Sequence, residues 1–133
     1  MHTILLMDDE ELMIEILIGY LAKKDRHFIA ATNGVEGLEK VKNNKIDLII
    51  SDIRMPNMDG IEFINTLYKK LKIHIPIIFI SAFGNEELNK LTWKAGAFDF
   101  VAKPIDSDRI THDVDEALKY GKEHLEKFLK ENP

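Results

Sequence analysis

The sequence predicts an α/β domain built on a doubly wound, five-stranded parallel sheet. Segments of helical period separate five short apolar runs that are rich in β-branched residues. Parallel neighbours in a sheet need a crossover connection, which is usually a helix. The first, third and fourth runs are apolar almost throughout, as expected for strands buried on both faces. The five runs are TILLM (3–7), HFIAA (27–31), IDLII (46–50), IPIIFI (75–80) and AFDFV (97–101).

The bulk composition indicates one soluble globular domain. The chain has 133 residues, of which 45% are hydrophobic and 31% are charged, and no apolar run approaches the roughly 20 residues of a membrane span. The N-terminus lacks the basic start and the apolar region of a signal peptide, so we expect a cytoplasmic protein. Cysteine is absent, which excludes disulfides and thiolate metal sites. A net charge of −5 argues against a nucleic-acid surface.

The helices expected between the runs carry apolar stripes. The first, over residues 11–24, has two apolar rows at spacings of three and four, Leu12, Ile16 and Tyr20 beside Met13, Leu17 and Leu21. The third begins after Asp59, which we expect to cap its N-terminus. Turn residues punctuate the remaining connections, with TNG at 32–34, MPNMDG at 55–60 and FGN at 83–85.

The last helical segment is longer than the sheet requires. It runs from Asp106 to about Glu131, roughly 39 Å at 1.5 Å per residue. Its first part can cover the sheet, whereas a later stripe lies about 11 Å or more further along the axis, and we expect that stripe to pass the edge of the domain. An exposed stripe would serve a homodimer or an output partner, and the alternative is that it folds back on its own domain. The stripe comprises Leu125, Phe128 and Leu129, and Gly121 marks either the boundary or a close contact.

Polar residues follow the predicted strands where each one ends. In open parallel sheets, ligands bind at the carboxyl ends of the strands, so these residues meet at one edge. They are Asp8, Asp9 and Glu10 after the first run, Ser51 and Asp52 after the third, Ser81 and Ala82 after the fourth, and Lys103 and Pro104 after the fifth.

The carboxylates of this set predict a metal site. Asp8, Asp9 and Asp52 would raise one another's pKa values unless a cation offset their charge. Because the ligands are all oxygen atoms, they select a hard ion, Mg²⁺ or its substitute Mn²⁺. A carboxylate in such a site can also attack phosphorus and form an aspartyl phosphate. The alternative reading of DDEE, the acidic first turn of a helix, stays open on that segment alone.

Four motifs in order resemble the receiver domain of bacterial two-component response regulators. They are MDDE after the first run, SDIRMPNMDG after the third, SA after the fourth and KP after the fifth. The resemblance covers roughly residues 1–120 and leaves 121–133 as an extension of the fifth helix. It implies a flavodoxin-like sheet with strand order 2-1-3-4-5, flanked by five helices.

The resemblance also implies a role for each site residue. The phosphoryl group would enter on one aspartate, with Mg²⁺ held beside it, and a hydroxyl and an aromatic side chain would form the switch. We further expect the Lys103–Pro104 bond to be cis. The assignments are Asp52 as phosphoacceptor, Asp8, Asp9, Asp52 and the Arg54 carbonyl as metal ligands, Ser81 and Lys103 on the phosphoryl oxygens, and Ser81 and Phe100 in the switch.

By the same resemblance, the chain is a signalling module and not an enzyme that turns over an external substrate. It would take a phosphoryl group from a sensor histidine kinase or a histidine phosphotransfer protein, and then switch the face formed by helix 4, strand 5 and helix 5. Autodephosphorylation should be slow, because Arg54 and Phe83 are large enough to obstruct an in-line water. Partners are therefore a kinase and an output surface, and no nucleic acid or membrane.

Two other functions compete with this one. A Mg²⁺-dependent phosphatase of the haloacid dehalogenase type also uses an aspartyl nucleophile, but that family carries Asp-x-Asp where this chain has adjacent Asp8 and Asp9. A receiver-like binding module that is never phosphorylated would not need the complete set of site residues.

Two aromatic residues also have purely structural interpretations. Phe100 could be a plain core aromatic that shares one face of its strand with Phe98, and Trp93 could be a packed helix residue. The sequence leaves open the cognate kinase, the phosphorylated lifetime, and whether an output domain follows.

Overall fold

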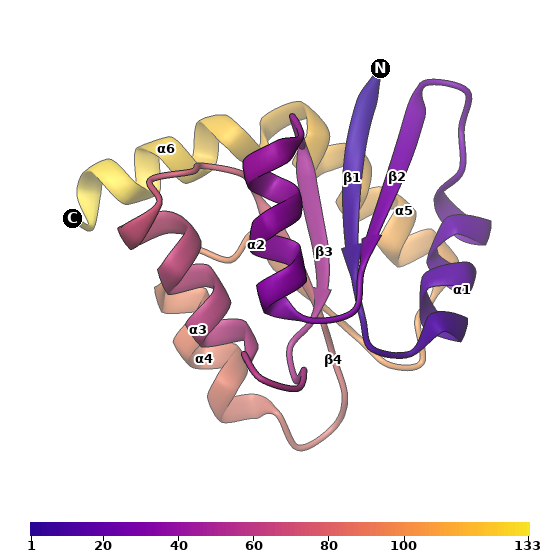
Figure 1. The fold of residues 1–133 in the computed structure, drawn as a ribbon, viewed down its shortest axis with the longest axis horizontal. Coiled ribbons are helices and arrows are strands. Elements are labelled where there is room, and N and C mark those ends of the chain that lie inside the picture. Colours follow the sequence, from indigo (N-terminus) through magenta and orange to yellow (C-terminus); the bar gives the residue numbers. More distant parts are fainter.

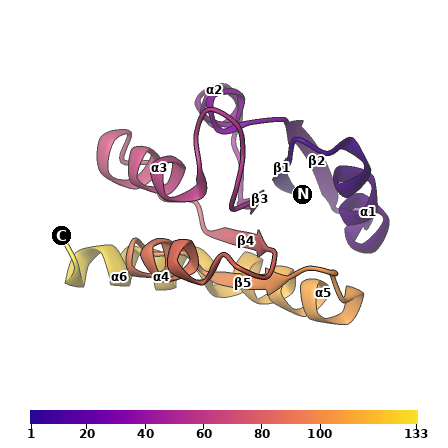
Figure 2. The ribbon, with the colours of Figure 1, turned by 90° about the horizontal axis from the view of Figure 1, so that it is seen from below.

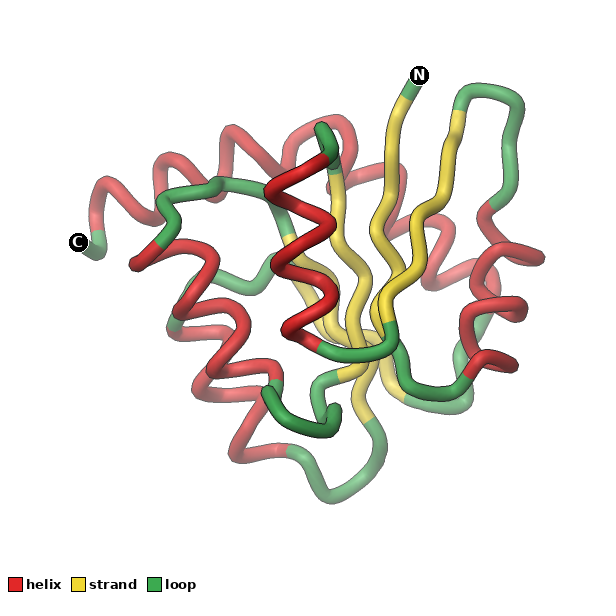
Figure 3. The backbone as a smooth tube through the Cα atoms, in the orientation of Figure 1, coloured by secondary structure: helices red, strands yellow, loops and turns green.

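The computed structural model describes Met1–Pro133 as a five-stranded parallel sheet with strand order β2-β1-β3-β4-β5 (Figure 1, Figure 3). The predicted fold class and strand order are confirmed. The third, fourth and fifth strands each begin two residues later than expected, so Asp52 and Ser81 are the last residues of their strands. The strands are β1 His2–Met7, β2 Arg26–Ala31, β3 Leu48–Asp52, β4 Ile77–Ser81 and β5 Asp99–Ala102.

Helices connect all consecutive strands and follow the last one. Three of them begin at a side-chain cap: Asn33, Asp59 and Asp106 each accept a hydrogen bond from a backbone N–H of the first turn, which confirms the predicted role of Asp59. The helices are α1 Glu11–Leu21, α2 Gly34–Asn43, α3 Gly60–Asn65 with the π-helical turn η1 Thr66–Lys70, α4 Glu86–Lys94, α5 Ser107–Glu116, the π-helical turn η2 Ala117–Gly121, and α6 Lys122–Glu131.

The sheet separates two hydrophobic cores. Alternation along β1 sends Leu5 and Met7 into one core and Ile4 and Leu6 into the other. The helices that contribute buried residues to the first core are α2, α3 with η1, and α6, and those that contribute to the second are α1 and α5 with η2. Figure 2 shows α2 and α3 on one side of the molecule and α5 on the other. None of the helices is long and apolar enough to cross a membrane.

Helix α1 buries a narrower stripe than its sequence indicates. Leu17 and Leu21 are buried, whereas Leu12 and Tyr20 are 65% and 43% exposed. Only one of the two predicted apolar rows therefore faces the sheet. The helix ends at Leu21 and not at Lys24, because Ala22 already has extended backbone angles.

The long C-terminal helix forms as predicted, but its apolar stripe is not exposed. Leu125 is 4% exposed and belongs to the first core, and Leu129 packs against that core. Two glycines make this packing possible. A Cβ on Gly121, in the helix itself, would lie 2.9 Å from Pro76, and a Cβ on Gly96, in the loop before β5, would lie 3.3 Å from Leu125 and Phe128. The expectation of a projecting stripe was wrong because the loops before β4 and β5 extend the surface that this helix covers. Figure 1 shows α6 running along the upper edge of the molecule to the C-terminus at the left.

The aromatic residues near β5 also depart from expectation. Phe100 packs against the first core and Phe98 against the second, so they do not share a face. The strand begins at Asp99, and the alternation assumed for the two residues therefore does not reach Phe98. Trp93 contacts Phe100, with ring centroids 6.0 Å apart, but it is 55% exposed and not a packed residue.

Candidate functional site

The register of the sheet brings the predicted polar residues to one edge. All five strands are parallel, so their carboxyl ends point the same way (Figure 3). At this edge, the last residues of neighbouring strands are partners in the sheet register. The pairs are Met7 with Ser51, Asp52 with Ile80, and Ser81 with Ala102.

Three carboxylates form the centre of the site. Asp8, Asp9 and Asp52 each offer an oxygen atom, and these atoms lie within 4.8 Å of one another. Asp8 and Asp52 are buried, at 1% and 7% exposure, whereas Asp9 is open to solvent. The predicted cluster therefore exists, and an approaching ion would reach it from the side of Asp9.

Asp8 indicates that this cluster lacks positive charge. Its Oδ1 accepts a hydrogen bond of 2.9 Å from the Glu10 amide, while its Oδ2 is buried without any partner. Burial raises the pKa of Asp8 to about 6. The nearby charges of Asp52 and Asp9 also raise this pKa, whereas the hydrogen bond from the Glu10 amide and the charge of Lys103 lower it. A buried, unpartnered carboxylate oxygen beside two further carboxylates fits a hard divalent cation.

Lys103 supplies the one cation that contacts the cluster. Its Nζ lies 3.3 Å from Oδ2 of Asp52, and the Arg54 amide lies 3.4 Å from Oδ1 of the same carboxylate. The Lys103–Pro104 peptide bond is cis, as predicted. Asp52 therefore contacts a lysine ammonium and also lies close to the two other aspartates.

Two asparagines that the sequence did not single out tie this edge to α4. The Ser81 hydroxyl donates a 2.9 Å hydrogen bond to Oδ1 of Asn89, and the Arg54 Nε donates one of 2.6 Å to Oδ1 of Asn85. The only signal for them was the i,i+4 spacing of Asn85 and Asn89 at the start of a helix that follows a site strand. Ser81 is consequently directed to α4, and no hydrogen bond joins it to Asp52.

The remaining predicted residues surround this centre. Phe100 is half-buried and stacks on Phe79, with ring centroids 5.9 Å apart. Phe83 is 99% exposed, and the Arg54 side chain is engaged with Asn85. The structure thus brings Asp8, Asp9, Asp52 and Lys103 together and leaves Phe83 in solvent.

A doubly wound parallel sheet of this strand order, with an acidic cluster and one lysine at its carboxyl edge, defines a protein of the flavodoxin-like fold class. A family model for the response regulator receiver domain matches residues 4–115. The chain belongs to the response regulator receiver domain family of two-component signalling. Its members are signalling modules.

Individual relatives support this assignment at the level of sequence and fold. The chemotaxis protein CheY of Bacillus subtilis is 35% identical over 118 residues, which cover 88% of this chain and 98% of that protein. The transcriptional regulatory protein GlrR of Escherichia coli is 32% identical over 87% of this chain, but the match spans 26% of its own length. A receiver domain protein from Clostridium thermocellum superposes with a TM-score of 0.82, at 25% identity, over 92% of this chain and 98% of that one. The chain spans about a quarter of the length of the regulatory proteins that it matches.

Proposed function

We propose that Asp52 accepts a phosphoryl group and that the modified site switches the face formed by α4, β5 and α5. The observation that carries this proposal is the environment of Asp52: a buried carboxylate 3.3 Å from the Lys103 ammonium, within an acidic cluster that includes an unpartnered oxygen of Asp8. The receiver unit would comprise residues 1–120, with 121–133 as an extension of its last helix.

The cluster would hold a divalent metal ion. Asp8, Asp9 and Asp52 would provide carboxylate ligands, and the Arg54 backbone carbonyl a further oxygen. When bound, Mg²⁺ or Mn²⁺ would offset the carboxylate charge and so allow an anionic phosphate to approach.

In the reaction itself, a carboxylate oxygen of Asp52 attacks the phosphorus atom of the donor. An oxygen–phosphorus bond forms, and the bond from phosphorus to the donor breaks, which is a phosphorus–nitrogen bond in a phosphohistidine and a phosphorus–oxygen bond in an acyl phosphate. The displaced imidazole or carboxylate keeps the electron pair. Lys103, already beside Asp52, balances the charge on the transferred phosphoryl oxygens.

The contacts with α4 offer a route from the site to the surface. A phosphoryl group on Asp52 would compete for the Ser81 hydroxyl, which now bonds to Asn89 on α4. Loss of that bond would free the first turns of α4, and Phe100 lies against Trp93 on the same helix. The response would therefore appear at α4 and β5, where a partner could detect it.

The donor would be a sensor histidine kinase, a histidine phosphotransfer protein or a small acyl phosphate. The longer regulators among the relatives suggest that modules of this kind control an attached output, and a stand-alone module would control a separate protein. Autodephosphorylation would be slow because Arg54 and Phe83 could restrict the approach of water to the phosphoryl group.

Two substitutions test the proposed division of roles. We expect Asp9→Ala to abolish both Mg²⁺ binding, measured by calorimetry, and phosphorylation by acetyl phosphate. Lys103→Ala should leave Mg²⁺ binding largely intact and weaken the change in Trp93 fluorescence on phosphorylation, because its charge faces the phosphoryl oxygens. Equal loss of metal binding in both variants would contradict this division.

A further inference from the structure

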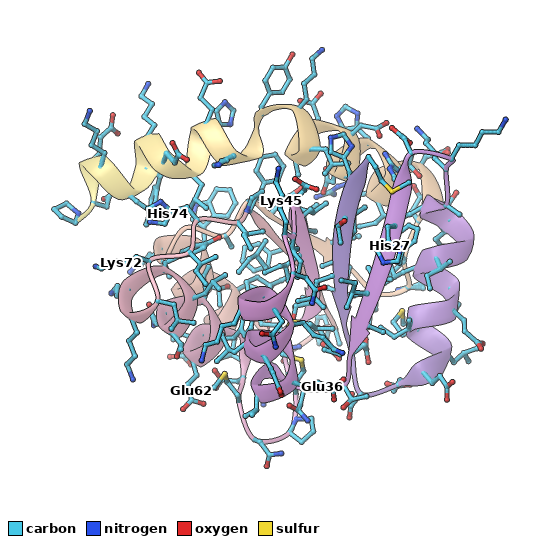
Figure 4. The ribbon with its side chains drawn as sticks, turned by 45° about the horizontal axis from the view of Figure 1, so that its top comes forward. His27, Glu36, Lys45, Glu62, Lys72 and His74 are labelled. Atoms are coloured by element: carbon cyan, nitrogen blue, oxygen red, sulfur yellow. The ribbon has the colours of Figure 1, made fainter.

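A groove lies at the amino edge of the sheet, opposite to the acidic cluster. It has a volume of about 550 Å³ and lies between α6 and the loops that precede β3 and β4. A second hollow of about 400 Å³ shares Lys72, His74 and Glu126 with it and continues along α6. Figure 4 shows Lys45, Lys72 and His74 near α6, whereas Glu36 and Glu62 lie towards the other edge. We call the two hollows together the amino-edge groove.

The amino-edge groove is basic although the chain is acidic. Its lining includes five lysines and two histidines but only two carboxylates, in a chain with a net charge of −5. One of these carboxylates, Asp47, already accepts a hydrogen bond of 2.8 Å from the Thr3 amide. None of the five lysines takes part in any of the ion pairs of the molecule. The lysines are Lys45, Lys69, Lys72, Lys122 and Lys130, and the histidines are His2 and His74.

Helix dipoles account for some of these charges but do not neutralise them. Lysines are favoured in the last turn of a helix, which explains Lys69 in η1 and Lys130 in α6. Lys45 follows the C-cap of α2, where the helix dipole also favours a cation, whereas Lys122 lies in the interior of the continuous C-terminal helix, away from either end of its dipole. Lys72 has φ of 56°, a left-handed conformation in which glycine would be less strained. Lys45, Lys72 and Lys122 therefore line the groove without a carboxylate partner.

The floor of the groove is apolar. Ile46 and Ile75 are buried beneath it, with Ile73 and Leu118 half-buried beside them. A free phosphate or a nucleic-acid backbone would leave such a floor uncovered, whereas a peptide can place carboxylates on the lysines and an apolar side chain on the floor. From Lys122 to Lys130 the groove extends about 12 Å along α6, the span of about four extended residues.

We propose that the amino-edge groove binds an acidic peptide segment of a partner protein. The occupant alternates carboxylates, which pair with Lys45, Lys72 and Lys122, with an aliphatic side chain that covers the isoleucines. Because the groove and the acidic cluster lie at opposite edges of the sheet, the segment can bind while Asp52 remains open to a phosphodonor. The inference does not depend on phosphorylation of Asp52.

A labelled model peptide tests this proposal. The probe is a fluorescein-labelled peptide of repeated Glu-Leu-Glu triplets, compared with its Gln-Leu-Gln counterpart by fluorescence anisotropy. We expect the wild-type chain to bind the acidic probe with an affinity that falls as salt is added. The double variant Lys45→Glu, Lys72→Glu should weaken binding at least about tenfold, equivalent to about 1.4 kcal/mol. The His74 ring resonances should shift in the wild-type titration and stay unchanged in that of Lys45→Glu, Lys72→Glu at the same probe concentrations.

The matched control is Lys24→Glu, Lys90→Glu, which makes the same change in net charge at exposed lysines outside the groove. It should retain wild-type affinity, and circular dichroism should show both double variants folded. Equal weakening by the two double variants, or equal binding of the glutamine probe, would overturn the proposal. So would self-association of the chain alone that Lys45→Glu, Lys72→Glu abolishes in sedimentation, because the occupant would then be a second copy.

Discussion

Asp113 on α5 is a buried acid outside the acidic cluster. It is 6% exposed, and Arg109 bridges it to Asp99 on β5 through contacts of 3.3 and 2.8 Å. Arg109 also donates a 2.9 Å hydrogen bond to the Phe100 carbonyl. Burial, together with the hydrogen bond and charge of Asp99, raises the pKa of Asp113 to about 6. Burial acts in the same direction on Asp99, but hydrogen bonds from Asp113 and Arg109 outweigh it and lower the pKa of Asp99.

The raised pKa of Asp113 predicts a pH-dependent stability. The pKa of an aspartate in the unfolded chain is about 4. Below that pH the protonated Asp113 makes its full contribution to stability, and this contribution is lost as the pH rises through about 6. Asp113→Asn keeps a neutral polar side chain at all pH values. We expect the stability of the variant relative to wild type to increase between pH 4 and 7 in urea unfolding. A constant difference over that range would show that Asp113 does not titrate as described.

Arg54 is the residue best placed to restrict water at Asp52. It lies two positions beyond the proposed phosphoacceptor, and its guanidinium is held by Asn85. We expect Arg54→Ala to shorten the lifetime of the phosphorylated chain, measured by intact mass after removal of acetyl phosphate. Phe83→Ala, which alters a side chain that is 99% exposed in this state, is the companion variant. If neither variant changes the rate, steric restriction of water is excluded.

At the scale of elements, α6 contributes to the fold through Leu125. The side chain is 4% exposed and lies within the first core. Leu125→Ala should reduce the free energy of unfolding by about 2–3 kcal/mol, the lower part of the range for buried leucines. Lys127→Ala, on the exposed side of the same helix, is the control and should change stability by less than about 0.5 kcal/mol. Equal small effects would mean that α6 is not packed in solution.

Two helical glycines should respond to alanine with opposite signs. A Cβ on Gly121 would lie 2.9 Å from Pro76, whereas one on Gly19 in α1 would meet nothing within 4 Å. Gly19→Ala should therefore stabilise the chain by about 0.5–1 kcal/mol, because alanine favours a helix interior. Gly121→Ala should destabilise it, because α6 must shift away from Pro76. Thermal unfolding of both variants checks the prediction, and a stabilising Gly121→Ala would contradict the close contact.

The sheet and the centre of the site could be predicted because their signals are local. Strands buried on both faces appear as continuous apolar runs, and the polar residues that follow each run lie at the ligand-binding edge. Asp8, Asp52 and Lys103 were found in this way. The strand order, in contrast, came from the resemblance and not from the pattern.

Other features depend on contacts between distant segments. The burial of Leu125 requires Gly96 and Pro76, which are far from it in the sequence, and a helix-length estimate takes no account of them. The hydrogen bond from Ser81 to Asn89 depends on how α4 is rotated against the sheet. Phe98 was assigned to the wrong face because β5 begins two residues later than predicted. Phe98 therefore lies outside the strand, where the alternation of side chains does not apply. Local sequence patterns do not reveal such contacts.

Across the whole molecule, the two edges of the sheet have different proposed roles, an acidic edge for phosphoryl transfer and a basic edge for an acidic segment. On the acidic edge, we propose that Asp52 carries the phosphoryl group. The most direct measurement is intact-mass analysis of the wild-type chain and of Asp52→Asn after incubation with acetyl phosphate, with Mg²⁺ and with a chelator. We expect the added mass of one phosphoryl group on the wild-type chain with Mg²⁺ and none in the other three samples. Equal incorporation in Asp52→Asn, or in chelator, would contradict it.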